Sequence, residues 1–300
     1  MKYFVAIPTY NGSNIWYSAA ENIKKYSPDG LHVQVVDSGS KDSTMEISKR
    51  FGFDVACIDS NQFNHGGTRN WLVELNPEYD VVIFLTQDAI PEPDYLNHIL
   101  SAFDDPDVAC AYGRQLPHID ANPIAQHARY FNYPEKSHVY SLKDAPNVGL
   151  KTVFMSNSFS AYRIDIFKKL GGFPFNTILC EDMYFTAKAV LAGYKVAYAS
   201  EAMVRHSHNY GPMEEFKRYF DIGVFHSDEP WIRQKFGGAG GEGKRFVLSE
   251  FYFLLKNGFL YVPLFFVNNF MKILGYKLGL NYKRIPQGLI KIFSMHKNFW

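Results

Sequence analysis

Residues 81–88 (VVIFLTQD) limit the choice of fold more than any other part of the sequence. Five bulky apolar residues end abruptly in Thr86, Gln87 and Asp88, and prolines follow at positions 91 and 93. A short apolar run with this punctuation is typical of a buried strand in a mostly parallel sheet. Asp88 would then lie at the carboxyl end of the strand, where open α/β sheets bind their ligands. An aspartate that only caps the next loop fits the segment equally well.

Predicted strands and helices alternate in the first 60 residues. Apolar runs at 3–7, 32–36 and 53–58 predict strands, and helical patterns separate them. This alternation with short connections predicts an α/β fold of Rossmann-like type, in which a mostly parallel sheet is flanked by helices. Residues 114–150 show little periodicity, and we expect a long loop region there.

Composition and short motifs narrow the possible classes of protein. Apolar residues make up 47% of the 300 residues, enough for one large core, and the three cysteines have no CxxC spacing. We therefore expect a reduced, cytoplasmic protein without a signal peptide. No GxxxxGK[ST] motif occurs and no GxGxxG motif follows the first predicted strand, which argues against a P-loop kinase and a dinucleotide-dependent enzyme.

The C-terminal end differs in charge from the rest of the chain. Residues 244–300 carry nine basic residues and one acidic residue, a net charge of +8, whereas residues 1–243 carry a net charge of −7. A basic tail on an acidic body indicates a segment with a partner of its own. We therefore expect a main domain at 1–243 and a set of basic, aromatic-rich amphipathic helices at 244–300.

Two kinds of partner are compatible with these C-terminal helices. Their longest apolar run, 259–267, has nine residues and is shorter than the roughly 20 that a spanning helix needs. Apolar faces interleaved with lysine and arginine predict helices that lie in a membrane interface and are attracted by anionic lipid. A dimerisation patch, which would make the protein a homodimer, is the competing interpretation. Nucleic acid is a poorer fit to such an apolar segment.

Two further motifs place charged residues at predicted helix starts. Adjacent glycines precede Arg69 in a first helical turn that suits a phosphate, although a plain glycine turn with a solvated arginine fits as well. Glu181 and Asp182 open another predicted helix, where acids are favourable dipole partners. Because neighbouring side chains point in different directions, one of these acids can shape the turn while the other faces a cleft.

A His-x-His pair completes the candidate site. His206 and His208 lie on an extended segment, which places both rings on one face. Either can join Asp88 on a divalent ion, and two solvent-facing histidines are the alternative. A metal-dependent hydrolase could use the same residues together with Asp182, although the sequence lacks a dense ligand cluster of the HExxH kind.

These motifs together resemble those of the family-2 inverting glycosyltransferases of GT-A fold, and within that family the bacterial rhamnosyltransferases. The resemblance covers roughly residues 3–235. It rests on the segments 7–11 (IPTYN), 35–42 (VVDSGSKD), 63–70 (FNHGGTRN), 86–89 (TQDA), 171–173 (GGF) and 181–182 (ED).

The resemblance implies a site for a nucleotide-sugar donor. Thr9, Tyr10 and Asp37 would hold the base and ribose, and Arg69 would lie near the diphosphate. Asp88 matches the last acid of the family's Asp-x-Asp metal motif, but Thr86 stands where the first acid is usual, so the metal contact should be weaker. The donor-binding residues that the resemblance implies are Thr9, Tyr10, Asp37, Ser38, Arg69, Gln87 and Asp88.

The resemblance also implies an activity. Asp182 matches the family's general base, and Mg²⁺ or Mn²⁺ would be held by Asp88 with His206 or His208. We expect an inverting enzyme that moves L-rhamnose from dTDP-β-L-rhamnose onto a lipid-linked glycan acceptor during synthesis of a bacterial surface polysaccharide. It would be cytoplasmic and peripheral on the inner face of the cell membrane. Another nucleotide-sugar donor and a non-catalytic, membrane-bound sugar-nucleotide-binding scaffold are the alternatives.

Overall fold

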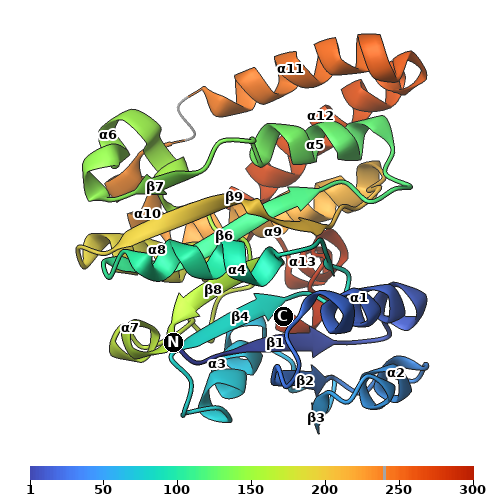
Figure 1. Ribbon diagram of the computed structural model, residues 1–300. Helices are drawn as coiled ribbons and strands as arrows, with labels where there is room; N and C mark the ends of the chain where they lie inside the picture. Colours follow the sequence, from blue (N-terminus) through green and yellow to red (C-terminus); the bar gives the residue numbers. More distant parts are fainter. Residues whose placement is uncertain (239–240) are drawn as a thin grey trace.

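A nine-stranded sheet forms the centre of the protein (Figure 1). The computed structural model describes residues 1–238 and 241–300. The strands are β1 (Tyr3–Thr9), β2 (Val33–Asp37), β3 (Asp54–Cys57), β4 (Val81–Leu85), β5 (Ile90–Pro91), β6 (Val108–Leu116), β7 (His138–Tyr140), β8 (Phe159–Arg163) and β9 (Lys195–Arg205). Their order is β3-β2-β1-β4-β8-β6-β9-β5, and β7 also pairs with β9.

Helices cover both faces of this sheet and extend beyond it at the C-terminal end. They are α1 (Ser13–Tyr26), α2 (Thr44–Arg50), α3 (His65–Glu74), α4 (Tyr95–Leu100), α5 (Pro123–Asn132), α6 (Ala145–Val148), α7 (Ile164–Lys169), α8 (Glu181–Leu191), α9 (Pro212–Asp228), α10 (Pro230–Phe236), α11 (Glu242–Asn257), α12 (Val262–Leu280) and α13 (Gln287–Phe293). The predicted α/β fold with a sheet between helices is confirmed.

The sheet has a parallel half and a mixed half. β1 pairs in parallel with β2 and β4, and β2 with β3, which is the alternation predicted from the first 60 residues. β8 is antiparallel to both β4 and β6, so β6 and its parallel neighbour β9 run in the same direction as β4. The carboxyl ends of β1, β2, β4, β6 and β9 therefore meet at one edge.

The core lies on both faces of the sheet, as the alternation of side chains along β1 shows. Val5 and Ile7 pack with Trp16 of α1 in one cluster, whereas Phe4 packs with Phe84 in the other. All five of these side chains are fully buried. Burial on both faces explains why the central strands appear in the sequence as continuous apolar runs rather than alternating ones.

The prediction of a long loop region at 114–150 is wrong. β6 continues to Leu116, and α5, β7 and α6 follow within the same stretch. Asn122 caps α5 by accepting a hydrogen bond from the amide of Ala125 at 2.9 Å, and Pro123 occupies the first turn. The buried face of α5 packs against α11, more than a hundred residues further along the chain.

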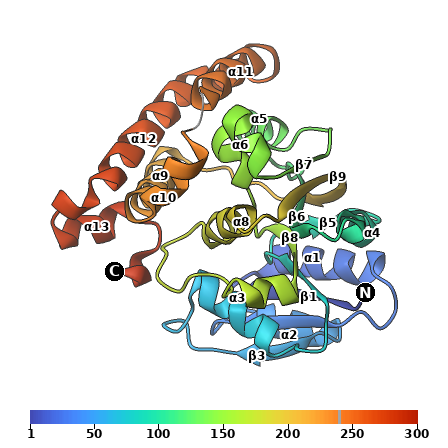
Figure 2. The same ribbon diagram turned by 90° about the vertical axis from the view of Figure 1, so that its left-hand side faces the viewer.

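The C-terminal helices pack directly on the main body. α12 packs closely against α9. A Cβ at Gly275 or Gly279 would clash with the backbone of Phe216 or Phe220, so only glycine at these positions allows the two helices to approach so closely. Figure 2 shows α12 running alongside α9, with α11 beyond it. By length and composition alone, the stretch Phe259–Leu280 could cross a membrane, but a core helix passes the same test.

Candidate active site

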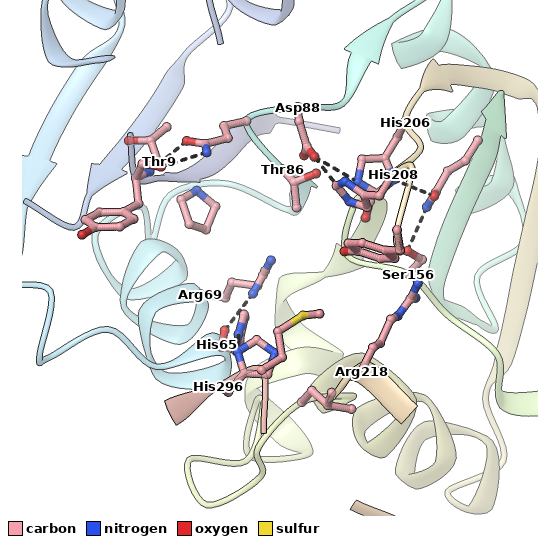
Figure 3. A pocket seen from close by; sticks show the side chains of 18 of the residues that line it. Thr9, His65, Arg69, Thr86, Asp88, Ser156, His206, His208, Arg218 and His296 are labelled. Carbon is pink, nitrogen blue, oxygen red and sulfur yellow. Dashed lines mark hydrogen bonds and ion pairs between the residues drawn. The ribbon is translucent and has the colours of Figure 1, made fainter. Parts of the chain in front are cut away.

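A cavity of about 770 Å³ opens at the edge where the carboxyl ends of the parallel strands meet (Figure 3). Residues that directly follow β1, β2, β4 and β9 line one part of it, and α5, α9 and residues 295–298 line another. The position agrees with the rule that open α/β sheets bind ligands at the carboxyl ends of their strands.

Asp88, His206 and His208 come together in this cavity. Asp88 Oδ2 lies 3.4 Å from His206 Nε2 and 3.6 Å from His208 Nε2, and one ligand atom of each residue lies within 4.8 Å of the others. Burial raises the pKa of Asp88, but the two histidines outweigh this effect and hold it well below its usual range. Burial, followed by the neighbouring His206, lowers the pKa of His208 to about 4. His206 is buried and His208 half-buried, and both face Asp88 in the cavity, so the interpretation of them as a solvent-facing pair does not hold for His206.

This cluster suits a divalent cation. One carboxylate and two imidazoles form a donor set of the kind that binds transition metals. His206 Nδ1 lies 2.9 Å from Gln115 Oε1, so a bond donated from Nδ1 leaves Nε2 free to act as a ligand on the side of Asp88. Gln115 is held in turn by Arg129, whose Nη1 donates to the same Oε1 at 2.6 Å.

Glu181 and Asp182 point in different directions from the start of α8. Glu181 is buried and accepts from Arg69 Nη1 at 3.0 Å and from Asn157 Nδ2 at 2.9 Å. Arg69 lines the cavity but is already neutralised by this ion pair. A contact between Arg69 and a diphosphate therefore stays a prediction, and the pair joins α3 to α8.

Asp182 has the protonation behaviour of a general base. Its Oδ2 accepts from the amide of Asn157 at 3.0 Å, and its Oδ1 from the amide of Met183 at 2.7 Å. Burial and the adjacent Glu181 raise the pKa of Asp182 to about 7. Asp182 is not itself among the lining residues, but Asn157 lies between Ser156 and Ser158, which are. The half-buried carboxyl group is thus hydrogen-bonded to a segment that lines the cavity.

The predicted nucleotide-binding residues divide into lining and supporting groups. Thr9, Tyr10 and Ser38 line the cavity, whereas Asp37 is fully buried. The Asp37 carboxylate accepts from Thr9 Oγ1 at 3.0 Å and from the amide and hydroxyl of Ser40 at 2.8 and 2.6 Å. It therefore shapes the turn that carries Ser38. A direct bond from Asp37 to a base stays a prediction.

Gln87 joins two strand ends at the cavity. Its side chain accepts from the amide of Tyr10 at 2.8 Å and donates to the carbonyl of Tyr10 at 3.0 Å. This pair of bonds ties the loop after β4 to the loop after β1. Gln87 also lines the cavity, so its predicted contact with the donor remains compatible with this supporting position.

Several lining residues escaped prediction because they lie outside the motifs at the strand and helix ends. Gln115, Arg129 and Arg218 lie on β6, α5 and α9, and His296 lies near the C-terminus. The rings of His65 and His296 approach at 3.4 Å between Nε2 and Nδ1, although 231 residues separate them. No local pattern in the sequence marks these four residues as lining a site.

Comparison with known proteins agrees with this geometry. The model of the family described as Glycosyl transferase family 2 matches residues 4–171, which is more than half of the chain. The chain belongs to glycosyltransferase family 2. The predicted family and the enzyme class, a glycosyltransferase, are therefore confirmed.

Two relatives match almost the whole chain. The O-antigen chain rhamnosyltransferase RfbN of Salmonella typhimurium is 53% identical, over 100% of this chain and 96% of its own length. The O-antigen chain rhamnosyltransferase WbaN of Salmonella anatum is 50% identical, over 98% of this chain and 94% of its own.

A solved glycosyltransferase supports the fold. The mannosyltransferase PcManGT of Pyrobaculum calidifontis, solved in complex with GDP-Man and Mn²⁺, superposes with a TM-score of 0.65. The match covers 94% of this chain and 88% of that one at 18% sequence identity. At this identity the likeness shows the fold alone, and it confirms the glycosyltransferase type of α/β architecture.

Proposed function

We propose that this protein is an inverting rhamnosyltransferase that transfers L-rhamnose from dTDP-β-L-rhamnose to a lipid-linked glycan in O-antigen synthesis. The observation that carries the proposal is a single cavity lined by the Asp88, His206 and His208 cluster, together with the half-buried carboxyl of Asp182, which is hydrogen-bonded to the lining segment 156–158. The choice of sugar and pathway rests on the two rhamnosyltransferases that resemble the whole chain at 50–53% identity.

In the proposed reaction, Asp182 accepts the proton of an acceptor hydroxyl. The hydroxyl oxygen forms a bond to the anomeric carbon from the face opposite the diphosphate, so the configuration inverts. The bond from that carbon to the diphosphate oxygen breaks, and the nucleoside diphosphate leaves with the electron pair. Negative charge therefore grows on the diphosphate while the sugar passes through a state like an oxocarbenium ion.

Asp88, His206 and His208 are the residues that would hold Mg²⁺ or Mn²⁺. When bound, such a cation supplies positive charge for the departing diphosphate. Mg²⁺ prefers oxygen ligands and Mn²⁺ also accepts imidazole, so the two histidines favour Mn²⁺. Gln115 fixes the orientation of His206 for this purpose.

The donor is tested with a panel of nucleotide sugars. We expect dTDP-rhamnose to bind the full-length protein at least ~10-fold more tightly than UDP-glucose or GDP-mannose, and Mn²⁺ to strengthen its binding. Isothermal titration with and without Mn²⁺ measures both effects. Equal binding of all three donors, or preference for a different sugar, would contradict the choice of rhamnose while leaving the family unchanged.

The C-terminal helices are proposed to lie on an anionic membrane. Their large exposed side chains form what we call the apolar face, and basic residues at 256, 277, 283, 284 and 291 are exposed around it. Exposed apolar groups on helices that also expose lysine and arginine are complementary to an anionic lipid surface. The apolar face consists of Tyr252, Leu255, Phe259, Leu260, Phe266, Phe270 and Ile273.

Removing two aromatic rings from the apolar face should weaken membrane binding. We expect the double variant Phe266→Ser, Phe270→Ser to bind vesicles rich in phosphatidylglycerol about 10²- to 10⁴-fold more weakly, because each of the two buried rings contributes roughly 1.5–3 kcal/mol. Sedimentation with vesicles gives the partition coefficient. The matched control, Ile119→Ser with Val139→Ser, removes two exposed apolar side chains outside the C-terminal helices and should bind normally. A double variant that binds vesicles normally but falls from dimer to monomer would support the dimerisation patch instead.

A further inference from the structure

Two arginines extend into the cavity without a carboxylate partner. Arg129 comes from α5 and Arg218 from α9, and both line the cavity. Figure 3 shows the side chain of Arg218 reaching across the cavity toward Ser156, below the histidines. In the described ranges 1–238 and 241–300, neither arginine forms an ion pair with an acid.

The other arginines near the site show how unusual this is. Arg69 is paired with Glu181 at 3.0 Å, Arg205 with Glu92 at 2.6 Å and Arg114 with Glu135 at 3.2 Å. Arg50, Arg163, Arg233 and Arg284 also form no ion pair in the described ranges, but none of them lines the cavity.

Arg129 and Arg218 make contacts within the described part of the chain, but none of these is an ion pair. Burial lowers the pKa of Arg218, whereas Tyr210 and Glu215, whose carboxylate pairs with Lys272, raise it. Arg129 donates from Nη1 to the neutral amide of Gln115, and its Nε is buried without any hydrogen-bond partner. Arg218 lies 5.7 Å from the ring centre of Tyr210. Burial, and then the repulsion of nearby Arg218, lower the pKa of Arg129. Two neighbouring cations in a partly enclosed cavity are costly unless an anion joins them.

The position of the two arginines indicates where that anion comes from. Thr9, Ser38 and Asp88, at the ends of β1, β2 and β4, form the side of the cavity assigned to the nucleotide. The arginines lie on α5 and α9, the helices that pack directly against α11 and α12, which carry the apolar face. An anion bound there is adjacent to the helices proposed to contact lipid.

The same end of the cavity lies near the proposed base. Arg129 donates to Gln115, and Gln115 Nε2 donates to Ser156 Oγ at 2.8 Å. The amide of the next residue, Asn157, donates to the carboxylate of Asp182. The hydroxyl of the acceptor must reach Asp182. The anion held by the arginines would lie at the same end of the cavity, so one acceptor molecule can carry both groups.

We propose that Arg129 and Arg218 bind the phosphate or diphosphate group that links the acceptor glycan to its lipid. The inference rests on the proposed function, since it assumes that the acceptor is lipid-linked. The diphosphate of the nucleotide donor has the same chemistry and is the other source of such an anion, so the test separates the two. Guanidinium groups suit either ligand because they bind phosphate oxygens with two parallel hydrogen bonds.

The test compares two diphosphates on the full-length protein. Farnesyl diphosphate serves as the lipid probe, farnesol as the same lipid without charge, and dTDP with Mn²⁺ as the donor probe. We expect Arg218→Gln and Arg129→Gln each to weaken binding of farnesyl diphosphate about 10- to 100-fold, the loss expected for charge-assisted hydrogen bonds. Binding of farnesol and of dTDP should change less than ~3-fold. Isothermal titration measures all three.

Matched variants control for folding and for indirect effects. Arg114→Gln removes an arginine that is one residue from Gln115 but pairs with Glu135 outside the cavity, and it should bind farnesyl diphosphate normally. Arg218→Lys keeps a positive charge and should retain part of the affinity. Because Arg129 also supports His206 through Gln115, an Arg129→Gln variant altered only in Mn²⁺ dependence would show a positioning role.

Each outcome decides the proposal. Loss of dTDP binding equal to or larger than the loss of farnesyl diphosphate binding would assign the anion to the donor and overturn the inference. Unchanged binding of both diphosphates, or wild-type protein that binds farnesyl diphosphate no better than farnesol, would overturn it as well. Arginine-dependent binding of farnesyl diphosphate in a protein that transfers no rhamnose would instead refute the proposed function and leave the lipid phosphate site standing.

Discussion

Replacing Asp182 with asparagine is expected to lower kcat for sugar transfer by about 10²- to 10⁴-fold, the usual contribution of a general base. The side chain keeps its size but can no longer take the proton of the acceptor hydroxyl. Binding of the donor should stay unchanged, because Asp182 is bonded to backbone amides rather than to the nucleotide end of the cavity. Single-turnover transfer assays combined with donor titration separate the two effects.

The pH dependence of kcat/KM provides a second, independent test of the role of Asp182. The pKa of Asp182 is raised to about 7 by burial and by Glu181, so the carboxylate form that can accept a proton is gained as pH rises through 7. In the wild-type protein, kcat/KM should therefore rise about tenfold per pH unit below pH 7 and level off above it. Asp182→Asn should show a low rate without this rise.

Unfolding of the Asp182→Asn variant would not explain a low rate that fails to rise with pH. A pKa near 7 in the folded state lies above the unfolded value of about 3.9. The folded protein thus binds this proton more tightly, and the carboxyl costs stability as pH rises from about 4 through 7. Asparagine removes that cost. The matched control is Glu250→Gln, a buried acid on α11 away from the cavity, which should keep both the rate and the rise with pH.

Replacing Asp88 with asparagine is expected to lower kcat/KM by about 10²- to 10³-fold, the usual loss when one group that stabilises the transition state is removed. The amide keeps the shape of the side chain, but the only carboxylate among the three clustered residues is lost. The two histidines alone should hold a divalent cation weakly. Titration of activity with Mn²⁺ after treatment with EDTA should show a much higher requirement for the ion.

The same titration after EDTA treatment also tests whether the site prefers Mn²⁺ or Mg²⁺. Wild-type protein should lose activity in EDTA and regain it at a lower concentration of Mn²⁺ than of Mg²⁺, since two of the three ligands are imidazoles. Asp107→Asn is the matched control, because Asp107 pairs with Lys195 at the surface and Asp105 remains as a second partner. Full wild-type activity in EDTA would rule out the metal site as a functional one.

Local sequence patterns were sufficient to predict those site residues that directly follow a strand. Val81–Leu85 is the central strand β4, and Asp88 follows it at the ligand-binding edge. His206 and His208 face the same side because residues two apart in an extended segment do so. These features depend on periodicities of two and of 3.6 residues, and such periodicities are present in the sequence itself.

Charge compensation was decided by the tertiary structure. Arg69 was expected at a diphosphate, but Glu181, 112 residues later, lies 3.0 Å from it. Arg129 and Arg218 drew no attention in the sequence, yet among the arginines that line the cavity they are the two that form no ion pair in the described part of the fold. No local pattern indicates which charges will meet when α3, α5, α8 and α9 close around one cavity.

The sequence by itself determined the strands, the edge at which they end, the family and the acids and histidines that stand at the strand and helix ends. Only the tertiary structure decided that α5 packs against α11, that His296 returns to His65, and that Asp182 is bonded to a segment lining the same cavity as Arg129 and Arg218. The physical reason is the range of the interactions. Hydrogen-bonded turns and apolar periodicity act over a few residues, whereas burial and charge pairing join segments separated by a hundred residues or more.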